Sequence, residues 1–352
     1  MSLRETTIVV LGATGLVGRE CLSILHGAGV PAHRVTPLAT AASAGAVVPF
    51  GPEALTVREV TPGAFDGAGV AIFAASSRAA LEWAPHALER GVRVVDNSSA
   101  FRLHPSVPLV VPEVNGHELD AGPPLVANPN CSTIILLAAV EPLRRLFGLG
   151  AIVLTTCQAV SGAGRAGLDA LARESQDRHA GPDPSPGSPF PEPCTGNVFS
   201  HNSPTDPDDG VNGEERKIIA ESRKILDRPD LPITPTCLRV PVARAHTESI
   251  LVRLERPATL AEVRGAYADA PGLRVVDDRA ANRFPTPRRA DGADPVLVGR
   301  FRPDPAEPPG PGGRSRSWCF LACGDQIRKG AALNAVQIAD RLASRSRAPT
   351  YA

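Results

Sequence analysis

The chain has 352 residues, and two domains are expected because single hydrophobic cores stop growing at roughly 250–300 residues. Its 37 lysine and arginine residues balance 37 aspartate and glutamate residues, so no excess of positive charge exists to hold a nucleic acid. Residues 1–7 lead into an apolar run much shorter than a signal or membrane segment. The seven scattered cysteines form neither a zinc pattern nor a disulfide scaffold. We expect a cytoplasmic protein with no metal site and no membrane association.

Short apolar runs alternate with helical stretches in the first part of the chain. The runs that predict strands are residues 7–11, 35–38, 70–73, 92–95, 110–111 and 125–127. The periodic stretches that predict helices are residues 15–28, 79–90 and 133–147. Because strands that alternate with helices form a parallel sheet covered by helices, we predict an α/β fold with a doubly wound, Rossmann-type domain over residues 1–130.

Longer apolar runs separated by loops follow residue 150 and predict a different architecture. The expected strands are residues 151–159, 236–242, 249–254 and 317–322. They indicate an α+β domain with a largely antiparallel sheet over residues 131–330. Residues 181–193 and 302–314 are rich in proline and glycine and are expected to be surface loops. The C-terminal segment 331–352 begins with an apolar-periodic helix over residues 331–343, which is expected to complete the first domain.

A glycine-rich turn is expected directly after the first strand. Residues 12–18 read GATGLVG and open the first helix. Gly12 and Gly15 permit a tight turn, and the N–H groups of the helix start, around Thr14, Leu16 and Val17, suit a pyrophosphate. We therefore predict dinucleotide binding rather than a glycine turn that binds nothing.

The choice between NAD and NADP is left open by the end of the second strand. Residues 38–45 contain no acidic residue to bond a ribose hydroxyl and no basic residue to pair with a 2′-phosphate. Thr40 and Ser43 are the residues there that can donate hydrogen bonds.

Cys131 is the candidate nucleophile. It lies where a predicted strand meets a strongly apolar helix, between Asn130 and Ser132. The positive end of a helix dipole lowers the pKa of a thiol at that position. A buried structural cysteine would occupy the same place, so partners elsewhere in the chain decide between the two interpretations.

Candidate partners occur in three later segments. His246 is a candidate general base because it is one of only eight histidines in a mostly apolar protein, although a lone histidine usually has no such role. Arg239 can present a planar guanidinium to a carboxylate. Gln158 ends a predicted strand before a loop with two glycines, where an amide can orient a substrate. Glu214 begins an amphipathic helix, although a solvated helix start would look the same.

Taken together, a series of motifs resembles the aspartate semialdehyde dehydrogenase family. They run in the order of the family from residue 8 to residue 340, which is nearly the whole chain. The motifs are GATGLVG at residues 12–18, DNSSAFR at 96–102, VPEVN at 111–115, NPNCST at 128–133, QAVSGAG at 158–164, NGEERK at 212–217, RVPV at 239–242 followed by His246, and RKGAALNAVQIA at 328–339.

The resemblance implies a reductive dephosphorylation of aspartyl phosphate to aspartate semialdehyde, in lysine, threonine and methionine biosynthesis. Cys131 would form the thioester, His246 would be the acid and base, and Gln158 would orient the substrate. Arg239 would hold the α-carboxylate, with Glu214 near the amino group. The remaining implied contacts are Arg102 and Lys217 for inorganic phosphate, and Thr14, Gly15, Leu16, Val17, Ser161, Gly162 and Gln326 for the cofactor.

The resemblance also implies partners and leaves alternatives. NADP is the expected cofactor, but Ala42 stands where members that prefer NADP usually carry arginine, so NAD stays open. A homodimer built through the sheet of the second domain, which can pair into a tetramer, is expected. Related N-acetylglutamyl phosphate reductases carry a glycine where this chain has Asn130. That enzyme and a catalytically silent dinucleotide-binding protein are the alternatives.

Overall fold

The computed structural model describes residues 2–176, 181 and 183–344. The chain divides into two compact units, Met1–Asn130 with Ala331–Ala352, and Cys131–Gly330. Residues 345–352 of the expected C-terminal segment lie outside the described residues. Within the described ranges, every helix is too short or too polar to cross a membrane.

The first unit contains a fully parallel six-stranded sheet with the order β5-β2-β1-β6-β7-β8. Its strands are β1 (Ile8–Leu11), β2 (Val35–Ala39), β5 (Arg58–Glu59), β6 (Val70–Phe73), β7 (Arg93–Asp96) and β8 (Leu125–Ala127). The strand order reverses direction at β1, as in a doubly wound sheet. This confirms the predicted Rossmann-type architecture.

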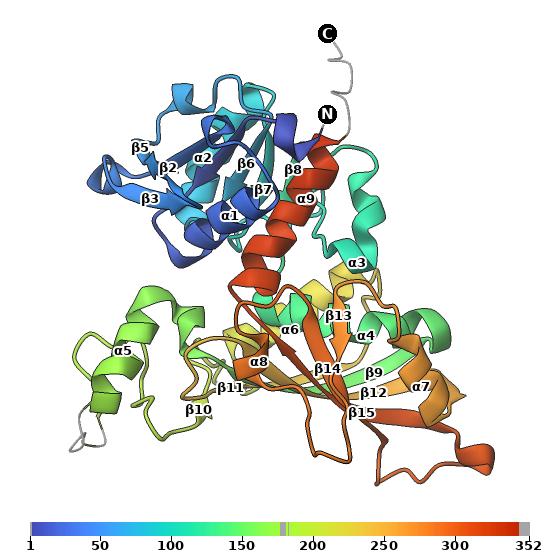
Figure 1. Ribbon diagram of the computed structural model, residues 1–352. Coiled ribbons are helices and arrows are strands. Elements are labelled where there is room, and N and C mark those ends of the chain that lie inside the picture. Colours follow the sequence, from blue (N-terminus) through green and yellow to red (C-terminus); the bar gives the residue numbers. More distant parts are fainter. Residues whose placement is uncertain (1, 177–180, 182, 345–352) are drawn as a thin grey trace. The chain divides into compact units, whose positions relative to one another are not determined.

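The side chains of this sheet explain why helices from both ends of the chain lie together. Ile8 and Val10 alternate with residues of the opposite face and join a buried cluster with α1 (Leu16–Gly27) and α9 (Asn334–Ala343). Figure 1 shows the red α9 beside this blue sheet, and α2 (Ser77–Glu89) follows β6 in the chain. The burial of apolar side chains on α9 therefore stabilises the packing of this C-terminal helix within the first unit.

Two features of the first unit differ from the predicted elements. The strand predicted at residues 110–111 is wrong, since an isolated bridge joins Leu109 to Ala127 and Val111 is the N-cap of α3 (Pro112–Asn115). Proline fits the first turn of a helix because its missing N–H has no partner there. An antiparallel hairpin of β3 (Val47–Phe50) and β4 (Glu53–Thr56) was not predicted.

The glycine-rich turn links β1 to α1 as predicted. Gly12 has a φ of +83°, and a Cβ added there would lie 2.3 Å from the carbonyl oxygen of Ala74. Gly15 is the N-cap of α1, and a Cβ on Gly18 would lie 2.2 Å from the oxygen of Gly12. The absence of side chains thus lets β1, β6 and α1 approach one another closely.

The second unit contains a seven-stranded sheet with the order β10-β11-β9-β12-β15-β14-β13. Four of its six neighbouring pairs are antiparallel, and β11/β9 and β13/β14 are parallel, which confirms a largely antiparallel sheet. Its strands are β9 (Leu149–Gln158), β10 (Phe199–Ser200), β11 (Ile233–Arg239), β12 (His246–Ala258), β13 (Leu273–Val275), β14 (Val296–Pro303) and β15 (Ser315–Gly324).

The helix α4 (Cys131–Phe147) is the core element of the second unit. Its residues are buried almost all round, including Ile134, Leu136 and Leu137. A helix that is apolar on all sides is stable only when it is enclosed by other elements. The other helices of this unit are α5 (Gly164–Gln176), α6 (Gly213–Ile225), α7 (Leu260–Ala266) and α8 (Pro287–Ala290).

The proline-rich segments are only partly the irregular surface loops that were expected. In residues 181–193, of which residue 182 is outside the described part, Phe190 is buried against Val160 and Cys194. The buried carboxylate of Glu174 accepts hydrogen bonds from the Cys194 and Thr195 amides, which holds this segment in place. In the segment 302–314, β14 extends to Pro303, and Pro311–Gly313 form a 3₁₀ turn.

The glycine turn gives a direct test of the close approach at Gly12. Gly12→Ala should lower the free energy of unfolding by about 2–5 kcal/mol, from the strain of a positive φ and the clash with Ala74. Gly45→Ala is the matched control, because Gly45 has the same φ of +83° but open space around its added Cβ. The control should lose only about 1–2 kcal/mol in urea denaturation. Equal losses for the two variants would contradict the close approach.

Candidate active site

Three of the predicted site residues lie at one edge of the second sheet. Parallel pairing of β11 with β9 places Arg239 opposite Gln158, at the carboxyl ends of both strands. The antiparallel β12 begins at His246 and pairs its next residue, Thr247, with Cys157. Arg239, Gln158 and His246 are all buried. Strand register therefore brings together residues that are far apart in the sequence.

Cys131 is the first residue of α4 and faces this edge. Its Sγ lies 3.5 Å from Nε2 of His246, which is hydrogen-bond distance for sulfur. The positive end of the α4 dipole favours negative charge on that sulfur. A Cβ added to Gly330 would lie 3.0 Å from the Cβ of Cys131, so the two backbones pass close to each other.

The backbone of Ala159 determines which nitrogen of His246 carries the proton. The Ala159 amide donates a hydrogen bond of 3.0 Å to Nδ1 of His246. Nδ1 must therefore present a lone pair, and the proton of the neutral ring lies on Nε2, which faces Cys131. Burial, together with the positive charge of Arg239 and against the opposing charge of Glu214, lowers the pKa of His246 to about 3. His246 is thus a neutral hydrogen-bond donor toward the sulfur.

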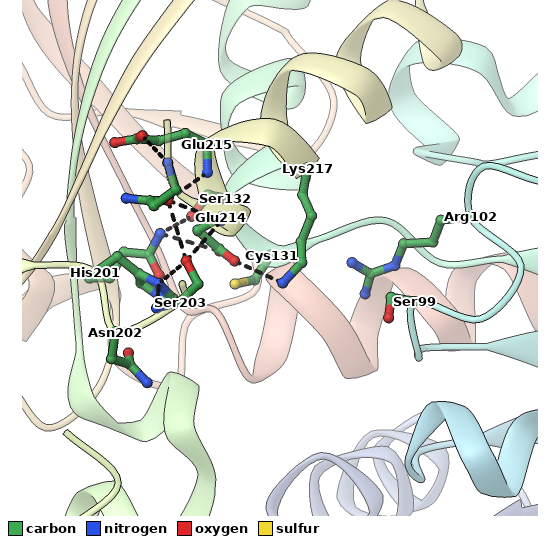
Figure 2. Close-up of polar contacts among 12 residues, drawn as sticks. Ser99, Arg102, Cys131, Ser132, His201, Asn202, Ser203, Glu214, Glu215 and Lys217 are labelled. Carbon is green, nitrogen blue, oxygen red and sulfur yellow. Dashed lines mark hydrogen bonds and ion pairs between the residues drawn. The ribbon is translucent and has the colours of Figure 1, made fainter. Parts of the chain in front are cut away.

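Gln158, Glu214 and Lys217 form a connected polar group next to the thiol. Nε2 of Gln158 lies 3.1 Å from the hydroxyl of Ser132 and 3.3 Å from Oε1 of Glu214. The other carboxylate oxygen of Glu214 accepts from Nζ of Lys217 at 3.2 Å. Figure 2 shows Glu214 and Lys217 on α6, with Ser132 and Cys131 beside them. Glu214 is buried, whereas Lys217 is partly exposed.

Arg239 is a buried cation held by neutral acceptors. Nη1 donates to the carbonyl oxygen of Ala159 at 2.6 Å, and Nη2 donates to Nε2 of His201 and Oδ1 of Asn202, each at 2.8 Å. The ring of Phe190 lies 5.3 Å from the guanidinium carbon. The Nε of Arg239 is buried and has no hydrogen-bond partner within the described residues. Burial lowers the pKa of Arg239, which nearby Glu214 opposes. This arrangement suits an anionic ligand.

His201 and Asn202 were missed by the sequence analysis. His201 directly follows the two-residue strand β10 and is only partly buried, and no motif marked either residue. Their contact with Arg239 depends on the pairing of the short β10 with β11, where Phe199 lies opposite Arg239.

The predicted cofactor residues of the second unit also lie beside His246. Nε2 of Gln326 donates to Oγ of Ser161, and Oε1 accepts from the Ala245 amide at 2.7 Å. Ala245 precedes His246 and has a φ of +72°. A Cβ on Gly162 would lie 3.2 Å from Nη1 of Arg239, so the chain passes close to the guanidinium.

The remaining predicted residues belong to the first unit. Arg102 donates to the carbonyl oxygens of Asn128 at 2.9 Å and Asn97 at 2.8 Å. Arg102 belongs to the first unit, whereas Lys217, the other predicted phosphate ligand, belongs to the second. Thr40 precedes the short 3₁₀ turn Ala41–Ser43 at the end of β2, where Thr40 and Ala42 are exposed. In the glycine-rich turn, Thr14, Leu16 and Val17 are half-buried and Gly15 is exposed.

Comparisons with known proteins agree with this arrangement. Residues 7–122 match the family described as semialdehyde dehydrogenase, NAD binding domain, and residues 140–329 match semialdehyde dehydrogenase, dimerisation domain. An aspartate-semialdehyde dehydrogenase of Synechocystis is 41% identical, over 96% of this chain and 97% of that protein. The Bacillus subtilis protein of the same name is 37% identical, over 96% and 98% of the two chains.

A solved structure extends the likeness to three dimensions. Aspartate semialdehyde dehydrogenase II of Vibrio cholerae, complexed with ASA, superimposes with a TM-score of 0.89 at 34% identity. The match covers 97% of this chain and 99% of that one. On these matches, and in agreement with the motifs, the chain belongs to the aspartate-semialdehyde dehydrogenase family.

Proposed function

We propose that the protein is an aspartate-semialdehyde dehydrogenase that reduces L-aspartyl 4-phosphate to L-aspartate 4-semialdehyde, in lysine, threonine and methionine biosynthesis. The main support for this proposal is that the Cys131 sulfur lies 3.5 Å from Nε2 of His246. The same site contains the buried Arg239, which suits an anionic ligand. A nucleophile, a charge-stabilising donor and a substrate-binding cation are together the parts that acyl transfer needs.

Cys131 is the nucleophile in this proposal. Its thiolate attacks the acyl carbon of the substrate, the C–O bond to phosphate breaks, and inorganic phosphate leaves with the bonding electron pair. A thioester then links the substrate to Cys131. Hydride delivered to the thioester carbon gives an alkoxide, which collapses to the aldehyde and returns the thiolate. The products are phosphate, the aldehyde and the oxidised nicotinamide dinucleotide that would supply the hydride, and the enzyme regains its starting state.

His246 stabilises negative charge in both halves of this reaction. Because the Ala159 amide occupies Nδ1, the Nε2–H group can donate to the thiolate and then to the alkoxide oxygen. Neither step requires a doubly protonated ring, which agrees with the lowered pKa of His246. In place of the acid and base role expected from the sequence, we propose that His246 donates a hydrogen bond from a fixed position.

Four charged residues divide the recognition of the substrate. Arg239 holds the α-carboxylate through its Nε, which has no hydrogen-bond partner in the described part of the chain. Glu214 lies near the substrate amino group, and Gln158 orients the acyl group. Arg102 and Lys217 bind the phosphate group. This division follows charge, since each cation is assigned an anionic group of the substrate.

The glycine-rich turn holds the pyrophosphate of a nicotinamide dinucleotide, which supplies the hydride when bound. The close approach at Gly12 and the accessible N–H groups at the start of α1 fit that group. Ser161, Gly162 and Gln326 are proposed as further contacts.

We propose NADP as the preferred cofactor, because residues 38–45 lack the acidic side chain that would repel a 2′-phosphate, and Thr40 and Ser43 can donate to it. Since a reactive thiol must stay reduced, we place the enzyme in the cytoplasm.

We also propose a homodimer built through the second sheet. Val153 on β9 is 48% exposed, and Ser249 and Arg253 on the adjacent β12 are also exposed, so this face of the sheet is accessible.

Sedimentation should give twice the mass of one chain, or four times that mass if dimers pair. Val153→Arg should shift the equilibrium toward monomers because it adds charge to the interface. A wild-type monomer at micromolar concentration would contradict this proposal.

The activity test is phosphate-dependent oxidation of aspartate semialdehyde, with NADP and NAD in parallel. We expect turnover that depends on phosphate and a higher kcat/KM with NADP. Cys131→Ala should lower kcat by at least about a thousandfold, because it removes the group that forms the thioester. Cys157→Ala is the matched control, since Cys157 is also a half-exposed free cysteine, and it should stay active.

Other outcomes separate the alternatives. Oxidation of N-acetylglutamate semialdehyde in place of aspartate semialdehyde would identify the sibling reductase. Binding of a dinucleotide without turnover of either aldehyde would identify a silent binding protein. Activity that survives Cys131→Ala would exclude the thioester mechanism.

A further inference from the structure

We propose that His201 is a positioning residue that fixes Arg239 for the substrate α-carboxylate and ties it to the helix that carries Glu214. The proposal rests on the proposed function, because it assigns a carboxylate to Arg239. His201 directly follows β10, and its amide donates to the carbonyl oxygen of Cys237 at 2.9 Å, so its backbone is attached to β11.

The hydrogen-bond partners of His201 define a single tautomer. A guanidinium has only donors, so Nε2 of His201 must accept from Nη2 of Arg239 at 2.8 Å. The proton of the neutral ring then lies on Nδ1, which donates to Oγ of Ser203 at 3.1 Å. The Ser203 amide is also 3.1 Å from Nδ1, but it cannot donate to a protonated nitrogen, so Ser203 acts through its hydroxyl.

Ser203 continues the chain of hydrogen bonds to the start of α6. Its Oγ donates to Oδ1 of Asn212 at 3.3 Å and accepts from the Glu214 amide at 2.9 Å. Figure 2 shows His201 and Ser203 beside Glu214 and Glu215. Glu215 completes the link by accepting from the Cys237 amide on β11 at 2.9 Å. Arg239 and Glu214, which are proposed to hold the two ends of the amino-acid head group, are therefore fixed relative to each other.

A neutral histidine is the suitable partner for a cation that must bind an anion. Burial is the main cause that lowers the pKa of His201 to about 4; Glu214 opposes this shift, and the charges of Arg239 and Lys217 add to it. The ring is therefore neutral and restrains the guanidinium without neutralising its charge. An aspartate in its place would pair with Arg239 and compete with the substrate carboxylate. Phe190 and Asn202, the other side chains on the guanidinium, are also uncharged.

The test compares two isosteric changes at His201 on two aldehydes. His201→Gln retains an acceptor near the Nε2 position, whereas His201→Asn retains only the Nδ1 side of the ring. The substrates are aspartate semialdehyde and 3-aminopropanal, which lacks the α-carboxylate. We expect His201→Asn to raise KM for aspartate semialdehyde about tenfold or more, the usual effect of losing a hydrogen bond to a charged group. His201→Gln should stay within about threefold of the wild type.

The aldehyde without a carboxylate separates positioning from folding. His201→Asn should leave kcat/KM for 3-aminopropanal within about twofold of the wild-type value, because that substrate makes no use of Arg239. The control is His104→Asn, since His104 is exposed and makes the same local contact with a serine two residues later. His104→Asn should change neither the KM for aspartate semialdehyde nor the kcat/KM for 3-aminopropanal.

Three results would overturn the proposal. They are an unchanged KM in His201→Asn, an equal loss for both aldehydes, or an equal loss in the Gln and Asn variants. Each of these results would count against the proposal only if the wild-type enzyme oxidises aspartate semialdehyde. A wild-type protein without that activity would instead refute the proposed function, and this proposal with it.

Discussion

One hydrogen bond from the main chain sets the chemistry of the site. The Ala159 amide donates to Nδ1 of His246, so the ring proton points at Cys131. This contact exists because β9 ends at Gln158 and the antiparallel β12 starts at His246 beside it. The tautomer is thus fixed by sheet geometry, and among substitutions at position 159 only proline would remove this backbone donor. Negative charge on sulfur or on a reaction intermediate is met by a donor that needs no reorganisation.

The same edge of the sheet holds the buried Arg239 through neutral hydrogen-bond acceptors, with the Glu214 carboxylate nearby. Ala159 contributes twice, since its carbonyl oxygen accepts from Arg239 while its amide restrains His246. His201 and Asn202 complete the cradle of the guanidinium without a carboxylate. Burying a cation in this way costs free energy unless a counter-charge arrives. A buried guanidinium with neutral hydrogen-bond partners therefore suits an anionic ligand.

Patterns of local sequence predicted much of this structure, while long-range neighbours determined the rest. The strand, GATGLVG turn and helix at residues 8–27 were predictable because glycine spacing and apolar runs act locally. The β3–β4 hairpin was not, since it lies outside the alternating pattern. Residues 110–111 were too short a run to distinguish a strand from the approach to Pro112. His201 could not be assigned because its partner Arg239 is reached only through strand pairing.

The most direct test of this account is the protonation state of His246, measured by nitrogen NMR of the imidazole rings, with His246→Gln to assign its signals. The account predicts a neutral ring with its proton on Nε2 at pH 5.5, because Nδ1 accepts from Ala159 and burial holds the pKa of His246 near 3. The ring should remain neutral when Cys131 is alkylated. A doubly protonated ring at pH 5.5, or a proton on Nδ1, would contradict the assignment of His246 as a fixed donor.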